Sequence, residues 1–152
     1  MKQIRIKVNK IIERFLVLIL VGMVLNVIWQ VFTRFLTSSP SAFTNELARY
    51  LMIWLGILGA AYISGKQEHV AIDFFVKKFN NSLRRFIDRF VLFSILSFAF
   101  FVMIIGGFNL VYITLKLEQY SPSLQIPLAL VYSIIPISGL LIIFYKVTQE
   151  KS

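Results

Sequence analysis

The residues that could do acid–base or metal chemistry are few, and the most suggestive of them lie close together near position 70. His69 is the single histidine of the chain, with Glu68 beside it and Asp73 four residues later. These groups alone do not complete a metal coordination shell, so a metal site would need ligands from distant parts of the chain. The chain has no cysteine, which excludes disulfides, thiolate-bound metals and thiol redox chemistry. We therefore predict no cofactor, no metal and no catalytic role, and we expect His69 at a membrane interface.

The composition shows what kind of element must carry these residues. Of the 152 residues, 58% are hydrophobic and 15% are charged, and the mean hydropathy is +0.78. An ordinary soluble domain has roughly 25% charged residues, so this chain cannot cover a soluble domain with polar surface. Its high apolar and aromatic content also excludes an intrinsically disordered chain. The composition therefore indicates an integral membrane protein.

The charged residues fall in clusters, and the uncharged runs between them define four helices. The runs are 19 residues between Arg14 and Arg34, 16 between Arg49 and Lys66, 26 between Arg89 and Lys116, and 27 between Glu118 and Lys146. A helix needs about 20 mostly apolar residues to cross the hydrocarbon core. We predict an all-α integral membrane protein, one membrane domain over residues 1–152, with spans at about 15–34, 44–65, 90–114 and 126–145. The first span begins like a signal peptide, but its apolar run is too long and no small-x-small cleavage site follows closely, so we expect it to be retained.

The basic residues predict how the four spans are oriented. Of the 16 Lys and Arg residues, 13 fall in the N-terminal arm, the loop between spans two and three, and the C-terminal tail. With four spans these three segments share one side, and the positive-inside rule makes that side cytoplasmic. Both termini are therefore predicted to be cytoplasmic. The net charge of +9 is then explained by orientation and by attraction to anionic lipids, and no nucleic-acid partner is expected.

The loop between spans two and three carries a further helical pattern. Apolar residues recur at helical spacing from Val70 to Phe90, with charged residues between them. We predict a basic amphipathic helix at about 70–80, which either lies on the membrane surface or packs its apolar side on neighbouring helices. Four basic residues of this loop are candidates for contact with anionic headgroups: Lys77, Lys78, Arg84 and Arg85.

Span two holds the most informative polar residues. Its uncharged run of 16 residues covers about 24 Å, less than the roughly 30 Å hydrocarbon core, so Arg49 is expected at or just inside the boundary. Glu46 lies three residues earlier on the same helical face, and an ion pair between the two would lower the cost of the charge. The pair is either an ordinary interfacial pair or a polar anchor directed toward a protein partner.

The same span carries small residues at four-residue spacing. Gly56, Ala60 and Ser64 form a stripe that lets another helix approach closely, and we favour a helix of this chain over a helix of another chain. Trp54 is expected on an aromatic surface toward a partner or lipid. The candidate residues for a partner interface are thus Glu46, Arg49, Trp54, Gly56 and Ala60.

The predicted spans lack the residues that transport chemistry usually needs. No Asp, Glu, His, Lys or Arg lies near the centre of any span. Proton and ion pathways through a membrane usually depend on such residues. The chain also lacks matching Gly/Pro-interrupted segments in its two halves, which are typical of transporters built from inverted repeats. These features disfavour a chain that transports a substrate on its own.

Several short motifs, taken together, resemble one transporter family. They are Glu46-Leu47-Ala48-Arg49, Leu55-Gly56 followed by Gly59-Ala60-Ala61, His69 with Asp73, and Ile135-Pro136-Ile137-Ser138-Gly139. Each motif alone is weak, but the resemblance covers about residues 10–146. The set is similar to the small Q-type (DctQ-like) membrane subunit of tripartite ATP-independent periplasmic (TRAP) transporters, with His69 and Asp73 as family-motif residues.

The resemblance implies a division of labour among three proteins. A periplasmic binding protein captures an organic acid, such as sialic acid or a dicarboxylate. A large M-type membrane subunit holds the substrate and sodium sites and moves in an elevator fashion. The small subunit enlarges the static scaffold in the bacterial inner membrane and helps to dock the binding protein. The resemblance thus implies sodium-coupled transport without enzymatic activity, and the run from Lys66 to His69 is similar to sialic-acid systems.

Two other classes of protein are alternatives. A small four-helix membrane enzyme of the glutathione-transferase type would share the length and the basic charge, but it would need a cluster of Arg, Asn, Glu and Tyr within its helices. A self-sufficient small exporter would need a carboxylate in the middle of the membrane. The sequence provides neither feature.

Overall fold

All regular elements in the described part of the chain are helical. The computed structural model describes residues 2–37, 41–66 and 81–149. The helices are α1 (Lys2–Thr37), α2 (Ala42–Gly65), α4 (Asn81–Ser97), the π-helix η1 (Phe98–Gly106), α5 (Gly107–Lys116), α6 (Leu128–Tyr132) and α7 (Ile134–Gln149). Four stretches are long and apolar enough to cross a membrane: Gln3–Leu36, Ala42–Gly65, Arg85–Lys116 and Leu128–Thr148. The prediction of an all-helical membrane protein with four long apolar helices is therefore confirmed.

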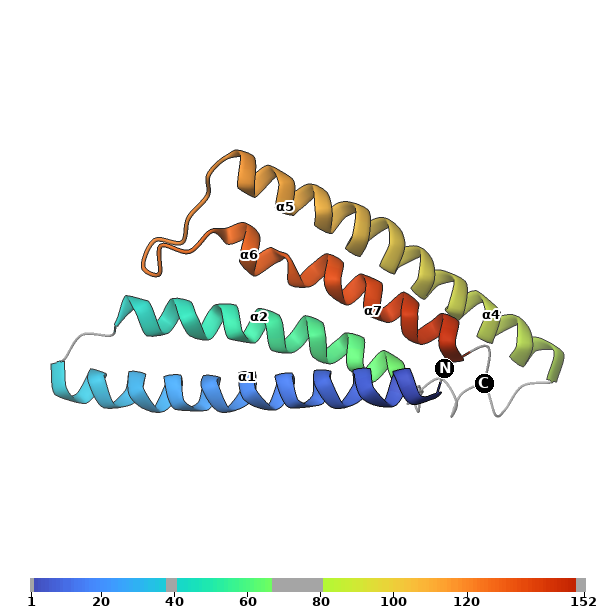
Figure 1. Ribbon diagram of the computed structural model, residues 1–152, viewed down its shortest axis with the longest axis horizontal. Helices are drawn as coiled ribbons and strands as arrows, with labels where there is room; N and C mark the ends of the chain where they lie inside the picture. The colour runs from blue at the N-terminus through green and yellow to red at the C-terminus, as the bar shows by residue number, and fades with distance from the viewer. Residues whose placement is uncertain (1, 38–40, 67–80, 150–152) are drawn as a thin grey trace.

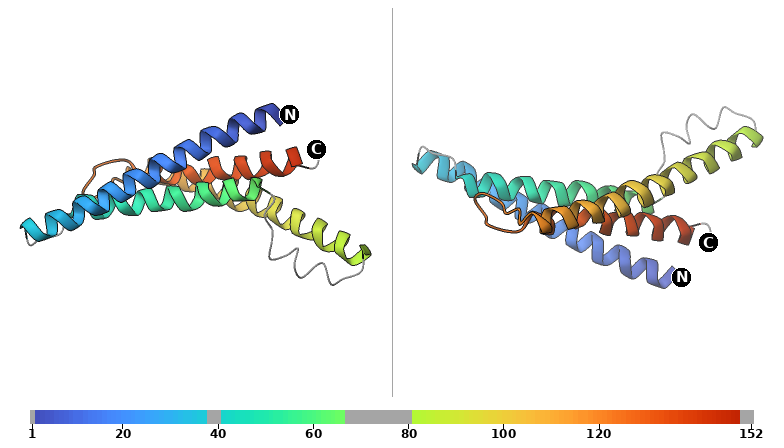
Figure 2. Two further views of the ribbon diagram at one scale, coloured as in Figure 1. Left: turned by 90° about the horizontal axis from the view of Figure 1, so that it is seen from below. Right: turned by 90° about the horizontal axis from the view of Figure 1, so that it is seen from above.

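The helices extend past the predicted spans at the end where the basic residues gather. α1 has 36 residues, so it is about 54 Å long, well above the roughly 30 Å of the hydrocarbon core. The third long helix already begins at Asn81, and its start reaches beyond the neighbouring helices in Figure 2. Long basic helix ends of this kind can therefore cross the headgroup layer while the apolar part spans the core.

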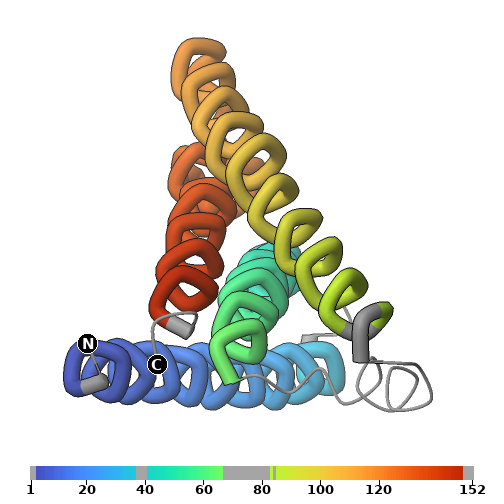
Figure 3. The backbone as a smooth tube through the Cα atoms, turned by 90° about the vertical axis from the view of Figure 1, so that its right-hand side faces the viewer, coloured from blue at the N-terminus to red at the C-terminus, as the bar shows by residue number. Residues whose placement is uncertain are grey.

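The four long helices lie in a row whose order differs from their order in the chain. α1 packs against α2, α2 against α7, and α7 against η1, while α5 contacts α6. Figure 1 shows this row, with both chain termini near the same end of the molecule. Figures 2 and 3 show that α1 is inclined to the other helices rather than parallel to them. The termini share one end, as four spans require, and their cytoplasmic location stays a prediction.

The third long helix changes its winding in the middle. α4 continues into η1, and η1 continues into α5. In η1, Ala99 is fully buried and faces Gly139 of α7. A Cβ atom added to Gly139 would lie 2.8 Å from the Cβ of Met103 and 3.1 Å from the carbonyl oxygen of Ala99. The π-helical segment is thus in backbone contact with α7.

The fourth span is divided by a turn at Ser133, between α6 and α7. Pro136 has no backbone N–H, so the carbonyl of Tyr132 has no helical donor four residues later. The Ser133 hydroxyl donates to the carbonyl oxygen of Leu130 at 2.7 Å, one turn before the break. The proline therefore explains why the fourth span is not one continuous α-helix.

The centre of the packing is α7. In the fourth span 39% of the residues in its most apolar window are buried, against 11% in each of the other three. Tyr145 of α7 is fully buried against Gly65 of α2, where an added Cβ would lie 2.8 Å from the tyrosine ring. At the other side of α7, a Cβ on Gly107 would lie 2.9 Å from the Cδ of Pro136. Close glycine contacts therefore fix α7 between α2 and the third long helix.

Candidate functional site

The first polar cluster lies at the end of the molecule away from the termini and is built on Glu46. This residue is in the second turn of α2 and is 9% exposed. Its carboxylate accepts a hydrogen bond from the Tyr50 hydroxyl at 2.7 Å and from the backbone amides of Ser123 and Leu124 at 2.8 and 3.1 Å. The loop between α5 and α6 thus closes over the start of α2, because a charged acceptor strengthens these amide bonds.

The expected ion pair between Glu46 and Arg49 is not formed. The two residues are three positions apart on α2, but the Glu46 carboxylate turns toward the α5–α6 loop, and Arg49 is exposed. Three neutral donors satisfy the carboxylate, so it needs no cation nearby. The helix geometry allowed the pair, and a loop 77 residues away in sequence supplied better-placed donors.

The contact between α1 and α2 contains polar groups near the same end. Asn26 of α1 is 8% exposed and donates its side-chain N–H to the carbonyl oxygen of Thr44 at 2.8 Å. One turn further along α1, Gln30 donates to the side-chain oxygen of Asn45 at 2.6 Å. Polar side chains in a membrane helix are satisfied by neighbouring helices in this way. They link α1 to the same turn of α2 that holds Glu46.

Trp54 also turns into the molecule. Its indole N–H donates to the carbonyl oxygen of Val131 at 3.1 Å, and its ring centroid lies 6.0 Å from that of Phe15 on α1. Trp54 therefore joins α1, α2 and α6, and its polar atom is used within the chain. Of the five candidates for a partner interface, the structure turns Glu46 and Trp54 inward.

The other three candidates lie together on one side of α2. Arg49, Gly56 and Ala60 are exposed, and so are two large apolar residues of the same side, Met52 and Ile63. We call these five residues the open face of α2. Arg49 and Ile63 lie seven residues before and after Gly56, so the helical repeat places them on one line.

The expectation that the small-residue stripe packs within this chain is wrong for Gly56 and Ala60, which are exposed. A Cβ added to Gly56 or Gly59 would meet no atom within 4 Å, whereas the glycines that do pack closely are Gly65, Gly107 and Gly139. The hydrophobic contacts of α2 come from the opposite side, where Leu58 and Ala61 are buried. Gly56 and Ala60 are therefore open to whatever lies outside the four helices, whereas Ser64 is half-buried.

The charged residues of the described spans flank the long uncharged runs. Besides Glu46, the buried charged residue is Lys146, which is 5% exposed and three residues before the end of α7. At the same end, Arg5 donates to the carbonyl oxygen of Gly65 and so ties α1 to the last turn of α2. Over residues 2–37, 41–66 and 81–149, no group of three His, Asp or Glu side chains is placed to hold a metal. The described helices thus have no charged group in mid-span for an ion pathway.

Several predicted features fall on residues that the structure does not describe. The interfacial helix at about 70–80, with Lys77 and Lys78, lies outside the described residues, and so do the motif residues His69 and Asp73. Arg84 belongs to α4, but its side chain is outside the description too; Arg85, the next residue, is exposed. The interfacial helix and the lipid contacts of this loop therefore stay predictions.

Sequence reasoning missed the partners of the polar residues. Ser123 and Leu124 act through their backbone amides, which carry no sequence signature. Ser121 is fully buried and accepts from the Leu124 amide at 3.1 Å, so the run from Ser121 to Ser123 was a signal for a structured turn. Asn26 was a second signal, because an isolated amide in an apolar span usually has a partner on another helix.

Comparison with known proteins gives the family. The model for "Tripartite ATP-independent periplasmic transporters, DctQ component" matches residues 23–149. The chain is 28% identical over 145 residues to a TRAP transporter small permease protein of Haemophilus influenzae, an alignment that covers 93% of this chain and 86% of that protein.

Further relatives are aligned over shorter stretches. The chain is 34% identical over 102 residues to the C4-dicarboxylate TRAP transporter small permease protein DctQ of Rhodobacter capsulatus, covering 66% of this chain and 44% of that protein. It is 32% identical over 84 residues to the sialic acid TRAP transporter small permease protein SiaQ of Vibrio cholerae, covering 55% and 49%. Because the family model covers most of the chain, this multi-pass membrane protein belongs to the DctQ component family of TRAP transporters, which are not enzymes.

Proposed function

We propose that this chain is the scaffold subunit of a sodium-coupled TRAP transporter in the bacterial inner membrane. In this proposal a large membrane subunit carries the substrate and the sodium ions, and a periplasmic binding protein delivers the substrate. The chief support is that the described spans have no Asp, Glu, His, Lys or Arg in their central parts. Ion coupling needs such groups or a dedicated set of oxygen ligands, so the pathway belongs to the partner.

The exposed apolar surface supports a role in enlarging a membrane scaffold. Large apolar side chains such as Phe35, Phe93 and Leu18 are more than two thirds exposed, which fits contact with lipid or another membrane chain. The four long helices lie in a row with α1 inclined at one edge, so the chain broadens whatever it joins rather than enclosing a pore (Figures 1 and 3). A broad support resists displacement while an elevator-type subunit moves beside it.

The open face of α2 is the proposed contact with the large subunit. Gly56 and Ala60 let another helix approach to van der Waals distance, and Met52 and Ile63 flank them with apolar surface. Arg49, on the same line at the outer end, is then available for a carboxylate or a carbonyl of the partner. Glu46 contributes indirectly, by holding the loop that closes the same end of the helix row.

The proposed substrate is an organic acid of the sialic-acid or C4-dicarboxylate type. The relatives SiaQ and DctQ carry these two substrates in their names. A 62-residue part of the chain is also 37% identical to part of a sialic acid TRAP transporter permease protein, SiaT, of Haemophilus influenzae, over 10% of that longer protein. Sialic acid therefore has support from two named relatives and is the first substrate to test.

Reconstitution into liposomes tests this function. We expect the lone chain to take up neither labelled sialic acid nor labelled succinate under an inward sodium gradient. The chain together with the large subunit and the loaded binding protein should take up one of them, and uptake should stop when sodium is replaced by potassium. Uptake by the lone chain, or full uptake by the large subunit without this chain, would contradict the scaffold role.

A further inference from the structure

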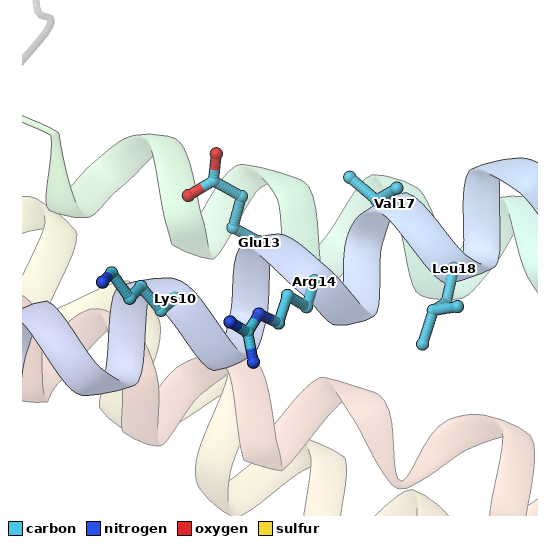
Figure 4. A pocket seen from close by; sticks show the side chains of 5 residues that line it. All are labelled: Lys10, Glu13, Arg14, Val17 and Leu18. Carbon is cyan, nitrogen blue, oxygen red and sulfur yellow. The ribbon is translucent and has the colours of Figure 1, made fainter.

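A separate surface, at the basic end of α1, has the arrangement of an anionic lipid site. An open hollow of about 560 Å³ is lined by five residues of α1, namely Lys10, Glu13, Arg14, Val17 and Leu18. Figure 4 shows these side chains along two turns of the helix, with the Glu13 carboxylate directed to a different side from the Arg14 guanidinium. The basic groups and the apolar groups are thus adjacent but at different heights along α1.

The stripe formed by Lys10, Arg14 and Leu18 faces away from the rest of the molecule. The inward side of α1 is marked by Ile12, which is buried, with Val8 and Leu16 packed on the same cluster. Each residue of the stripe follows one of these by two positions, which is about 200° around a helix. Lys10, Arg14 and Leu18 are accordingly exposed, and neither basic group has an ion-pair partner among the described residues.

The depth of these residues matches the layers of a bilayer. Arg14 is the last charge before 19 uncharged residues, which cover about 28 Å and so fill a hydrocarbon core of roughly 30 Å. This places Arg14 at the hydrocarbon boundary. Lys10 lies one turn, about 6 Å, outside it in the headgroup layer, and Leu18 lies about 6 Å inside it.

We propose that this surface binds one anionic phospholipid, with Lys10 and Arg14 on its phosphate and with Val17 and Leu18 against the first carbons of an acyl chain. Two cations one turn apart on one stripe match a single phosphodiester with a further anionic or polyhydroxy headgroup. Glu13 disfavours a second anion on its own side and so limits the site to one lipid. The proposal does not depend on the identity of the transported substrate or on the face that meets the large subunit.

A helix of the partner subunit is the competing occupant, and the charges argue against it. A partner helix would have to place carboxylates opposite both cations at the membrane boundary, whereas each phospholipid already carries its phosphate at that depth. The uncharged and bulky neighbours Ile11 and Leu18 are each 68% exposed, which leaves no small-residue stripe for close helix approach on this side.

Native mass spectrometry of the full chain tests the proposal, because it resolves each bound lipid. We expect the first phosphatidylglycerol to bind at least tenfold more tightly than the first phosphatidylcholine. Each basic residue near the headgroups contributes on the order of fivefold in affinity, so the double variant K10Q/R14Q should lose about twenty-five-fold for phosphatidylglycerol. Its affinity for phosphatidylcholine, which carries the same phosphate but a cationic headgroup and no net charge, should fall much less.

Two control variants separate this site from general charge effects. R34Q/R49Q removes an equal number of positive charges from the opposite end of the molecule and should keep the preference for phosphatidylglycerol. K10R/R14K retains both charges and should keep it too. An unchanged preference in K10Q/R14Q would overturn the proposal. So would loss of the large subunit from the purified complex of that variant without any change in bound lipid, because the surface would then be a protein contact.

Discussion

Six of the seven glycines of this chain fall into two groups that mark two different regions. The group that packs closely is Gly65, Gly107 and Gly139, all on the contacts around α7, and the group that meets no atom within 4 Å is Gly22, Gly56 and Gly59. Glycine weakens a helix relative to alanine by about 0.5–1 kcal/mol wherever it lies. In the first group that cost is offset by close helix contact within the chain. In the second group no close contact with a described neighbouring helix offsets it, so lipid or a partner chain can fill the space beside these glycines.

The largest expected effect comes from adding one methyl group to the closely packed region. Gly139→Ala places a Cβ 2.8 Å from the Cβ of Met103 and 3.1 Å from the Ala99 carbonyl oxygen, and backbone cannot yield as a long side chain can. We expect the free energy of unfolding to fall by about 1–3 kcal/mol. Equilibrium unfolding in mixed detergent micelles, followed by circular dichroism, measures it.

Gly59→Ala is the matched control for this comparison. The same methyl group meets nothing within 4 Å there, so the variant should unfold with unchanged stability or gain up to about 1 kcal/mol from helix propensity. Equal losses in both variants would remove the distinction between the two groups of glycines.

The next effect concerns the loop between α5 and α6, which Glu46 binds to the start of α2. Glu46→Ala removes the acceptor for the amides of Ser123 and Leu124, so the loop between α5 and α6 should open more often. We expect hydrogen exchange of these two amides to become about tenfold faster. Glu13→Ala, which removes an exposed carboxylate from α1, should leave their exchange unchanged. If the loop amides were equally protected in both variants, Glu46 would not hold the loop.

A smaller effect is expected for the indole bond of Trp54. Trp54→Phe keeps a ring near Phe15 but removes the donor to the Val131 carbonyl, which should lower the free energy of unfolding by about 1 kcal/mol. Trp29→Phe is the control, because Trp29 is 59% exposed; its substitution should cost less than about 0.5 kcal/mol. Equilibrium unfolding of the two variants in micelles measures both losses. Equal losses would mean that the indole hydrogen bond of Trp54 does not stabilise the chain.

The sequence predicted the features that depend on neighbouring residues along the chain. It did not predict the contacts between segments that are distant in sequence. Uncharged runs predict the four long helices because a bilayer excludes charge over about 30 Å. The Glu46 partners were not predictable, since two backbone amides 77 and 78 residues away have no residue type of their own. The π-helical winding of η1 was also hidden, because an all-apolar run has the same pattern in either helix. The direction of the Gly56 stripe depends on which side of α2 faces α7, and helical spacing alone leaves that side open.

The smallest expected effect on this chain alone is also the most informative about its partner. Gly56→Leu adds a large side chain on the open face of α2, where an added Cβ meets no atom of a neighbouring element within 4 Å, so its free energy of unfolding should change by less than about 1 kcal/mol. If a helix of the large subunit packs on this face, the same side chain would overpack that contact, and the affinity between the subunits should fall about tenfold. Co-purification at a series of protein concentrations measures the loss. Gly22→Leu adds the same side chain on α1, at a half-buried position where an added Cβ likewise meets no atom within 4 Å, and should leave the affinity unchanged. Were Gly22→Leu to weaken the complex and Gly56→Leu to leave it intact, the contact would belong to α1, and the open glycines of α2 would face lipid.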